Sequence, residues 1–198
     1  MKQIFYKIDS VHLLSHWGDY GDILVSGDSD NLDGWRKGPL QLYRTGPFIP
    51  PITFPGVGVI VVTDDLKRKM ESSDLKGLTF RPVIKKHIVY LEWEKWDKSA
   101  AEPKEFPESG EPEDYIHSNP HSRGLAERMP DLWEIILSEG IESKRIDDQI
   151  LIKPASWNES DLFYAQGTLL IYTAVKAKNW LELHVADWVG FSPENNIV

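Results

Sequence analysis

The stretch VIVVTDDLKRKMESSDLKGLTFRPV, residues 59–83, indicates the fold, because it reads as a strand, a helix and a second strand in close succession. The apolar, β-branched run at 58–62 predicts a strand that is buried on both faces. Thr63 is a plausible N-cap for the helix, and the two aspartates that follow it suit the positive end of a helix dipole. Gly77 predicts the end of that helix.

A second stretch, LLIYTAVKAKNWLELHVADWVGFSP at residues 169–193, follows the same order. Each stretch opens with an apolar run closed by a threonine and ends on a short strand that finishes at a proline. The expected second helix has one apolar face, formed by Ala177, Trp180, Leu181, His184 and Val185. We therefore predict an α+β protein, with a mixed sheet covered by helices and two related strand-helix-strand units giving a pseudo-duplicated architecture.

The remaining elements follow from local patterns, and the length of 198 residues fits a single domain over 1–198. Pro130 at a first helical position and Gly140 just past the end predict a helix over 130–139. The stretch 78–93 predicts two strands with a bend near Lys85 and Lys86. Further strands are expected at 1–8, 22–26, 40–44 and 146–153.

Composition excludes several classes of protein. Hydrophobic residues make up 41% of the chain and aromatic residues 11%, which is enough for a packed core. The absence of cysteine excludes disulfides and thiolate metal sites. No run approaches the roughly 20 apolar residues that a membrane span requires. The first residues alternate between apolar and polar, unlike the core of a signal peptide. We expect a soluble cytoplasmic protein that does not bind membranes.

The net charge of −9 is concentrated in two regions. Five aspartates between residues 19 and 33 contribute −5, and residues 92–114 contribute −6, so the rest of the chain is near +2. Such focused negative potential repels nucleic acid and attracts basic partners. Residues 97–121 are rich in Pro, Glu and Ser and lack periodicity, which predicts a flexible acidic insertion. Taken alone, each acidic region also fits an ordinary solvated loop.

Two HxxxH pairs could in principle bind zinc, but such a pair needs a helix and further ligands. His12 and His16 lie among glycines, and Pro120 lies between His117 and His121. Neither pair therefore lies in a convincing helix. We expect ordinary loop histidines and no metal site.

Catalytic signatures are also missing from the sequence. It contains no GxSxG, P-loop, GxGxxG or HExxH motif. Asp64 and Asp65 follow a strand end, where catalytic carboxylates can lie, but their place in the first turn of a helix accounts for them fully. His184 lies on the predicted apolar helix face and is expected to be a partly buried structural residue. We predict no enzymatic activity, no catalytic residues and no cofactor.

Aromatic residues lie beside both acidic regions. Trp93 and Trp96 precede the insertion, and Trp35 lies within the first acidic region. Aromatic rings beside carboxylates are typical of protein interfaces, where the rings supply buried area and the acids steer a basic partner. Trp93 could equally pack beneath the helix of the first unit. Trp35 is expected to be exposed.

The first strand-helix-strand unit resembles a family of bacterial immunity proteins from polymorphic toxin systems, many of them first described as a domain of unknown function. The family's segment is a strand ending in Ser or Thr, an amphipathic helix, and an ending similar to GLxGxxFxPV. Here the ending is DLKGLTFRPV, and more loosely VADWVGFSP. The approach SDLFYAQGTLLIYT, with an Asp, a Phe and a Gly before the strand, is also similar to the family's. The resemblance implies a cytoplasmic inhibitor expressed beside a toxin.

The leading hypothesis is thus a non-enzymatic immunity protein that binds and neutralises a cognate protein toxin with a basic surface. One alternative is a metal-dependent or acid/base enzyme with a dispersed site, formed by Asp114, His117 and His121. Another is a structural protein-interaction domain. The residues predicted to contact the partner are Asp28, Asp30, Asp33, Trp35, Glu105, Glu108, Glu111, Glu113 and Asp114.

Overall fold

A computed structural model describes residues 3–30, 38–146 and 149–193 of the chain, and these form an α+β protein. Its α-helices are α1 (Asp19–Ser26), α2 (Asp64–Glu71), α3 (Asp114–Ser118), α4 (Arg123–Arg128) and α5 (Val175–Val185), with short 3₁₀ turns at Ser15–Trp17, Trp93–Lys95 and Pro154–Ser156. The strands are β1 (Phe5–Ser10), β2 (Asp28–Ser29), β3 (Gln41–Gly46), β4 (Ile52–Thr53), β5 (Val61–Thr63), β6 (Thr79–Pro82), β7 (Ile84–Tyr90), β8 (Leu132–Ile136), β9 (Glu139–Ile141), β10 (Ser143–Ile146), β11 (Gln149–Ile152), β12 (Leu162–Ala165), β13 (Ile171–Ala174) and β14 (Val189–Pro193).

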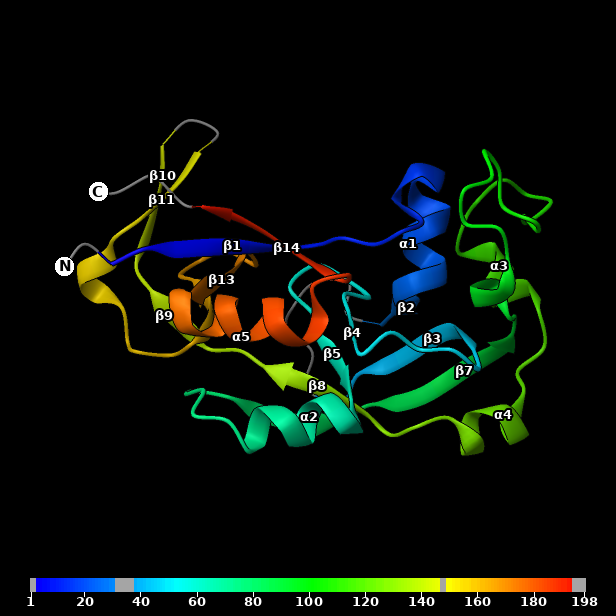
Figure 1. Cartoon of the computed structure of the whole chain (residues 1–198), viewed down its shortest axis with the longest axis horizontal. Coiled ribbons are helices and arrows are strands. Elements are labelled where there is room, and N and C mark those ends of the chain that lie inside the picture. The colour runs from blue at the N-terminus through cyan, green and yellow to red at the C-terminus, as the bar shows by residue number, and fades with distance from the viewer. Residues whose placement is uncertain (1–2, 31–37, 147–148, 194–198) are drawn as a thin grey trace.

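Two of the sheets share one hydrophobic core. One sheet has the strand order β14-β1-β13-β12-β9, and the other has the order β4-β5-β8-β6. Helix α5 lies against the first sheet, and α2 lies against the second (Figure 1). Leu66 and Met70 of α2 join Leu181 and Val185 of α5 in the same buried cluster. The apolar stripe of each helix therefore holds the two sheets together.

The two strand-helix-strand stretches are connected in the same way. Strands β5 and β6 both pair antiparallel with β8, which lies between them. Strands β13 and β14 both pair antiparallel with β1, which lies between them. In each case a helix joins two strands of the same direction across one strand of the opposite direction.

The third sheet, β2-β3-β7, lies at the other end of the molecule from β9 and the β10–β11 hairpin (Figure 1). Strand β3 pairs parallel with β7 and antiparallel with β2. Helices α1, α3 and α4 lie around this sheet, as the ribbon shows. Among the helices of the described residues, none has the length and apolarity needed to cross a lipid bilayer.

Helix α2 begins where the sequence predicts. Thr63 is the N-cap of α2, and its side chain accepts a hydrogen bond from the backbone N–H of Leu66 at 3.4 Å. The helix ends at Glu71, before Gly77. Gly77 has a φ of +76°, and a Cβ added there would lie 2.6 Å from the Ser160 hydroxyl. The glycine thus permits a tight turn against another segment and does not cap the helix.

The predicted strand at 22–26 is wrong, because these residues belong to α1. Tyr20, Leu24 and Val25 are buried on one side of the helix, while Asp22 is exposed. The three apolar residues of the run DILV are compatible with a buried strand or with the inner face of a helix.

The predicted helix over 130–139 is also wrong. Residues 132–136 form β8, the strand between β5 and β6. Two neighbours in the sheet outweigh the terminal signals of the sequence. Gly140 lies in β9, where a Cβ would be 2.4 Å from the Phe163 Cβ. Close packing against Phe163 therefore accounts for this glycine.

The other strand predictions differ from the structure in their details. The break between β6 and β7 falls at Val83. The register of β3 with β7 shifts at Lys86, because Leu42 pairs with Lys85 and the next residue, Tyr43, pairs with His87. The predicted strand at 146–153 corresponds to the end of β10 and the whole of β11, which pair as a hairpin. The strands predicted at 1–8 and 40–44 correspond to β1 and β3.

Candidate functional site

The structure brings the two acidic regions together at one end of the molecule. Asp28, at the start of β2, lies beside α3, and its Oδ2 is 3.3 Å from the Nε2 of His117. The ring of Tyr43 lies 5.4 Å from that of His117 and supports it from β3. Figure 1 shows α1, β2 and α3 at this end. We call the surface formed by α1, β2 and residues 97–121 the acidic face.

Aromatic contacts attach residues 97–121 to α1 and the turn before it. The carbonyl of Ala100 accepts hydrogen bonds from the Trp17 indole at 2.9 Å and the His16 ring at 3.0 Å. The rings of Phe106 and Tyr115 lie 4.6 and 6.4 Å from that of Tyr20. The stretch between Phe106 and Tyr115 is thus anchored at both ends on one residue of α1. The flexibility expected for the segment stays a prediction.

Most of the predicted partner-binding residues lie on this face, and most are exposed. Asp30 is exposed, and its Oδ1 accepts a hydrogen bond from the backbone N–H of Gln41 at 2.9 Å. Asp28 and Asp114 are half-buried. Asp33 and Trp35 lie outside the described residues. The exposed acids of the segment are Glu105, Glu108, Glu111 and Glu113.

Two further carboxylates on the acidic face were not among the predicted contacts. Asp19 and Asp22 lie in the first turn of α1, and both are exposed. The Oδ1 of Asp22 is 2.5 Å from the Nε2 of the buried His12 ring, whose Nδ1 accepts a hydrogen bond from the backbone N–H of Leu14. Reading residues 22–26 as a strand concealed this arrangement. The i, i+4 spacing of Tyr20 and Leu24 was the available signal for a helix.

Buried polar side chains fix α1 on β3. The Arg44 side chain is fully buried and donates hydrogen bonds to the carbonyls of Thr45, Val25 and Phe48. Burial lowers the pKa of Arg44 to about 9, so the guanidinium stays charged at neutral pH. The Thr45 hydroxyl donates to the carbonyl of Leu24 at 3.4 Å. The carbonyls of Leu24 and Val25 lie at the end of α1, where a positive charge is favourable.

An aromatic cluster lies beneath the acidic face. Trp93 is 1% exposed, and its ring meets that of Phe48 edge-on at 5.1 Å. It packs with residues of α1, so the alternative that it packs beneath α2 is wrong. Trp17 and Tyr20 belong to the same cluster, and Trp96 packs against it. These rings form a packed base for the acidic face.

Tyr20 is the unusual member of the cluster. Its hydroxyl is buried and has no hydrogen-bond partner among the described residues. The neighbouring Tyr115 hydroxyl donates a hydrogen bond to the Glu105 carboxylate at 2.8 Å. Burial, Tyr115 and Glu105 all raise the pKa of Tyr20 above its ordinary value. Burial and the bond to Glu105 likewise raise the pKa of Tyr115.

A surface pocket of about 410 Å³ opens beside this pair. Tyr90, at the end of β7, lies on its wall and is 59% exposed. We call it the Tyr90 pocket. Apart from Leu91, its side chains are aromatic or charged, and the ones relevant to binding are Tyr90, Glu92, Trp96, Asp97, Glu105 and Tyr115.

The two HxxxH pairs do not converge. The Nδ1 of His121 accepts a hydrogen bond from the backbone N–H of Ile88, while His117 faces Asp28. The Nε2 of His16 contacts the carbonyl of Ala100. Within residues 3–30, 38–146 and 149–193, no group of three or more His, Asp or Glu side chains could hold a metal ion. Asp114, His117 and His121 thus do not form such a metal-binding group among the described residues.

The other acids and histidines considered from the sequence also have structural surroundings. Asp64 and Asp65 lie in the first turn of α2, and Asp64 accepts a hydrogen bond from the Trp133 indole at 3.0 Å. The hydrogen bond from Lys69 lowers the pKa of Asp65. His184 is exposed, which corrects the expectation of partial burial. Its ring stacks on Trp180 of the preceding turn, with centroids 4.0 Å apart.

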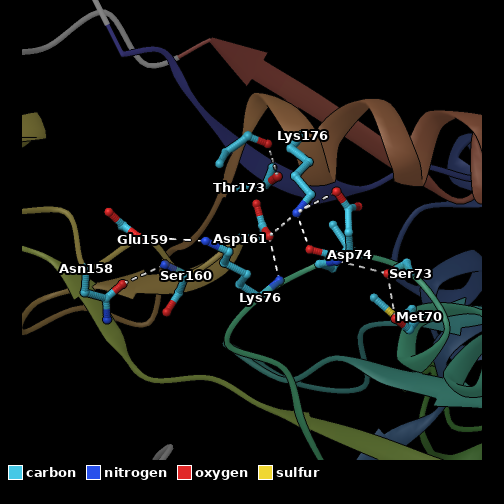
Figure 2. A network of polar contacts seen from close by, with 12 residues as sticks. Met70, Ser73, Asp74, Lys76, Asn158, Glu159, Ser160, Asp161, Thr173 and Lys176 are labelled. Atoms are coloured by element: carbon cyan, nitrogen blue, oxygen red, sulfur yellow. Dashed lines mark hydrogen bonds and ion pairs between the residues drawn. The ribbon is translucent and has the colours of Figure 1, made fainter.

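A second polar cluster, around the buried Asp161, joins the two strand-helix-strand stretches (Figure 2). The Asp161 carboxylate accepts a hydrogen bond from the backbone N–H of Lys76 at 2.6 Å and lies 3.4 Å from the Lys176 ammonium. Lys176 also contacts the carbonyl and the carboxylate of Asp74. The cluster thus ties the turn after α2 to the start of α5.

A cavity of about 450 Å³ lies beside this cluster. Its charged lining residues are Lys76, Glu159, Asp161 and Lys176, so the formal charges cancel. The cavity has no surplus charge to attract an ionic ligand, and the Asp161 carboxylate is occupied by its internal partners. We therefore regard this region as part of the scaffold and the acidic face as the candidate functional site.

Comparison of the chain with protein-family models gave no match, and comparison with curated protein sequences gave none either.

Proposed function

We propose that this protein is a non-enzymatic immunity protein, which binds a cognate protein toxin and blocks it by occupying a basic surface. The observation that carries the proposal is the contact between Asp28 and His117. It joins two acidic regions that are distant in the sequence and so concentrates their carboxylates on one face. A concentrated field of one sign steers an oppositely charged partner and raises its association rate.

The composition of the acidic face supports a protein partner over a small substrate. Exposed carboxylates lie beside partly exposed rings such as Phe106, which is 50% exposed, and Tyr90. An interface needs both components, because apolar area supplies affinity and charge supplies the on-rate and specificity. Nucleic acid would be repelled by the same carboxylates. The resemblance of residues 59–83 to immunity proteins points to the same class of partner.

We also propose that the stretches 59–83 and 169–193 are related copies. Both contain a strand, a helix and a strand, and in both the two strands flank an antiparallel neighbour. The neighbour is β8 in one case and β1 in the other. The copies would form a scaffold, with the acidic face built from other parts of the chain. A protein that protects its own cell from a toxin would act in the cytoplasm.

Co-expression with whatever reading frame adjoins this gene tests the proposal, which predicts that the neighbour encodes the toxin. Cells that express the toxin should grow only when this protein is present, and the two should co-purify. A triple variant, E108K/E111K/E113K, should protect less. A matched variant, E71K/E142K/E182K, makes the same change in net charge at exposed acids of α2, the β9–β10 connection and α5. The proposal would be refuted if the unmodified protein gave no protection. It would also be refuted if both triple variants protected as well as the unmodified protein does.

A further inference from the structure

The Tyr90 pocket has aromatic walls at the edge of the acidic face. Tyr90 contributes a ring that is 59% exposed, and Trp96 and Tyr115 contribute two more. The faces of Trp and Tyr rings attract cations, and they do so more strongly when water is partly excluded. A pocket of about 410 Å³ between such rings has room for the end of a long side chain.

The charges of this pocket leave an excess of one negative charge. Glu92, Asp97 and Glu105 line it together with Lys95 and Lys104. The Lys95 ammonium is held by the Glu92 carboxylate at 2.5 Å. That pair is neutral as a whole. Of the remaining lining charges, the two negative charges of Asp97 and Glu105 are balanced only by the one positive charge of Lys104. One added cation would bring the lining to neutrality.

Tyr20 lies behind one wall of the pocket, against the ring of Tyr115. Tyr20 is 1% exposed, and its hydroxyl has no hydrogen-bond partner among the described residues. It lies against Tyr115, whose own hydroxyl binds Glu105, and both of these line the pocket. A buried hydroxyl without a partner costs stability. Tyr115 and Glu105 thus form a hydrogen-bonded wall of the pocket, and the Glu105 carboxylate can accept from a donor placed there.

We propose that the Tyr90 pocket receives one arginine or lysine side chain of the toxin, with the cation against Tyr90 and Trp96 and its N–H donors directed to Glu105. This inference rests on the proposed function and names the contact that would anchor it. A cation is required because the lining already carries surplus negative charge. Arginine and lysine share this chemistry, although the planar guanidinium stacks better on rings.

The test uses the intact ¹⁵N-labelled protein and N-acetyl-L-arginine methylamide as the probe. The Trp96 indole signal, identified with a W96F variant, should shift in a saturable way during the titration. The citrulline analogue, which has the same shape without the charge, should leave it unchanged at equal ionic strength. N-acetyl-L-lysine methylamide in a third titration distinguishes the two cations. The Trp180 indole on α5 serves as an internal control.

Two variants locate the binding. Y90A and E105Q should each lower the affinity for the arginine probe by about fivefold or more. This is the loss expected for one cation–π contact or one charged hydrogen bond. L183A changes a residue that is 79% exposed on α5 and should leave binding unchanged. Equal shifts with arginine and citrulline, or equal affinities in Y90A, E105Q and the unmodified protein, would overturn the inference.

Failure of the pocket proposal can be distinguished from failure of the proposed immunity function. If the unmodified protein protects cells and Y90A/E105Q protects equally well, the pocket is not the anchor, although the protein is still an inhibitor. If the arginine probe binds the pocket but no toxin is neutralised, the pocket recognises cations and the immunity proposal fails.

Discussion

The Nε2 of His117 lies 3.3 Å from the Oδ2 of Asp28, and this contact brings together two acidic regions that the sequence separates widely. Both side chains are partly exposed, with 41% and 37% of their surfaces accessible. The contact is therefore weak in energy, because exposed pairs contribute at most about 1 kcal/mol. Its importance is positional, since it marks where β2 lies beside α3.

This arrangement can be tested by cross-linking. The chain has no cysteine, so a D28C/H117C variant carries a single pair of thiols. A short bis-maleimide should join them within one molecule and change the mobility of the denatured protein on a gel. The control pair D28C/L183C places the second thiol on α5 and should not cross-link within the molecule. Efficient cross-linking of the control pair, or none in the test pair, would contradict the fold at this face.

A comparison of two tyrosine variants tests the surroundings of Tyr20. Tyr20→Phe removes a buried hydroxyl that has no partner among the described residues, so the free energy of unfolding should stay equal or rise by about 1 kcal/mol. Tyr115→Phe removes a hydrogen bond to Glu105 and should lower it by about 0.5 kcal/mol. Urea unfolding measures both. A large loss of stability in Tyr20→Phe would mean that this hydroxyl has a strong partner.

Stability should fall at alkaline pH. The folded protein raises the pKa of Tyr20 and Tyr115, chiefly through burial, above the unfolded value of about 10. Below that value both states keep the phenolic protons, so the stabilisation is fully present. Above it the unfolded chain loses protons that the folded protein retains, and stability decreases as pH rises. The decrease should be shallower in Tyr20→Phe, as urea midpoints measured from about pH 9 to pH 11 would show.

Two glycines with positive φ separate backbone strain from steric clash. Gly77→Ala and Gly110→Ala both place an alanine in the left-handed region, at φ of +76° and +84°. Only at position 77 would the new Cβ collide, because Ser160 lies within 3 Å, whereas nothing lies within 4 Å at position 110. We expect losses of about 3 and about 1 kcal/mol in the free energy of unfolding. Equal losses would show that Ser160 yields without cost.

Elements with local signals were predictable from the sequence. Thr63 and the acids after it mark the start of α2 through contacts within one helical turn. The apolar spacing of Leu181 and Val185 likewise indicates α5. The run DILV in α1 was misread because its three apolar residues fit either period. Residues 132–136 were misread because their pairing with β5 and β6 is non-local.

The acidic face could be predicted only in part. Its composition is visible in the sequence, but the contact of Asp28 with His117 depends on how β2 and α3 are placed by other elements. The packing of Phe106 and Tyr115 on Tyr20 is equally non-local. Residues 97–121 have no sequence periodicity from which the contacts of Phe106 and Tyr115 could be predicted. The Tyr90 pocket was missed for the same reason, because β7, the 3₁₀ turn at Trp93–Lys95 and α3 meet only in the folded chain.

The association rate with the purified toxin, measured at about 0.05 M and about 0.5 M NaCl, tests the central claim most directly. For the unmodified protein we predict a rate constant at least about tenfold higher at low salt, and a much smaller salt effect for E108K/E111K/E113K. The matched variant E71K/E142K/E182K should behave like the unmodified protein. Rates that do not depend on salt, or that fall equally in both variants, would contradict binding through the acidic face.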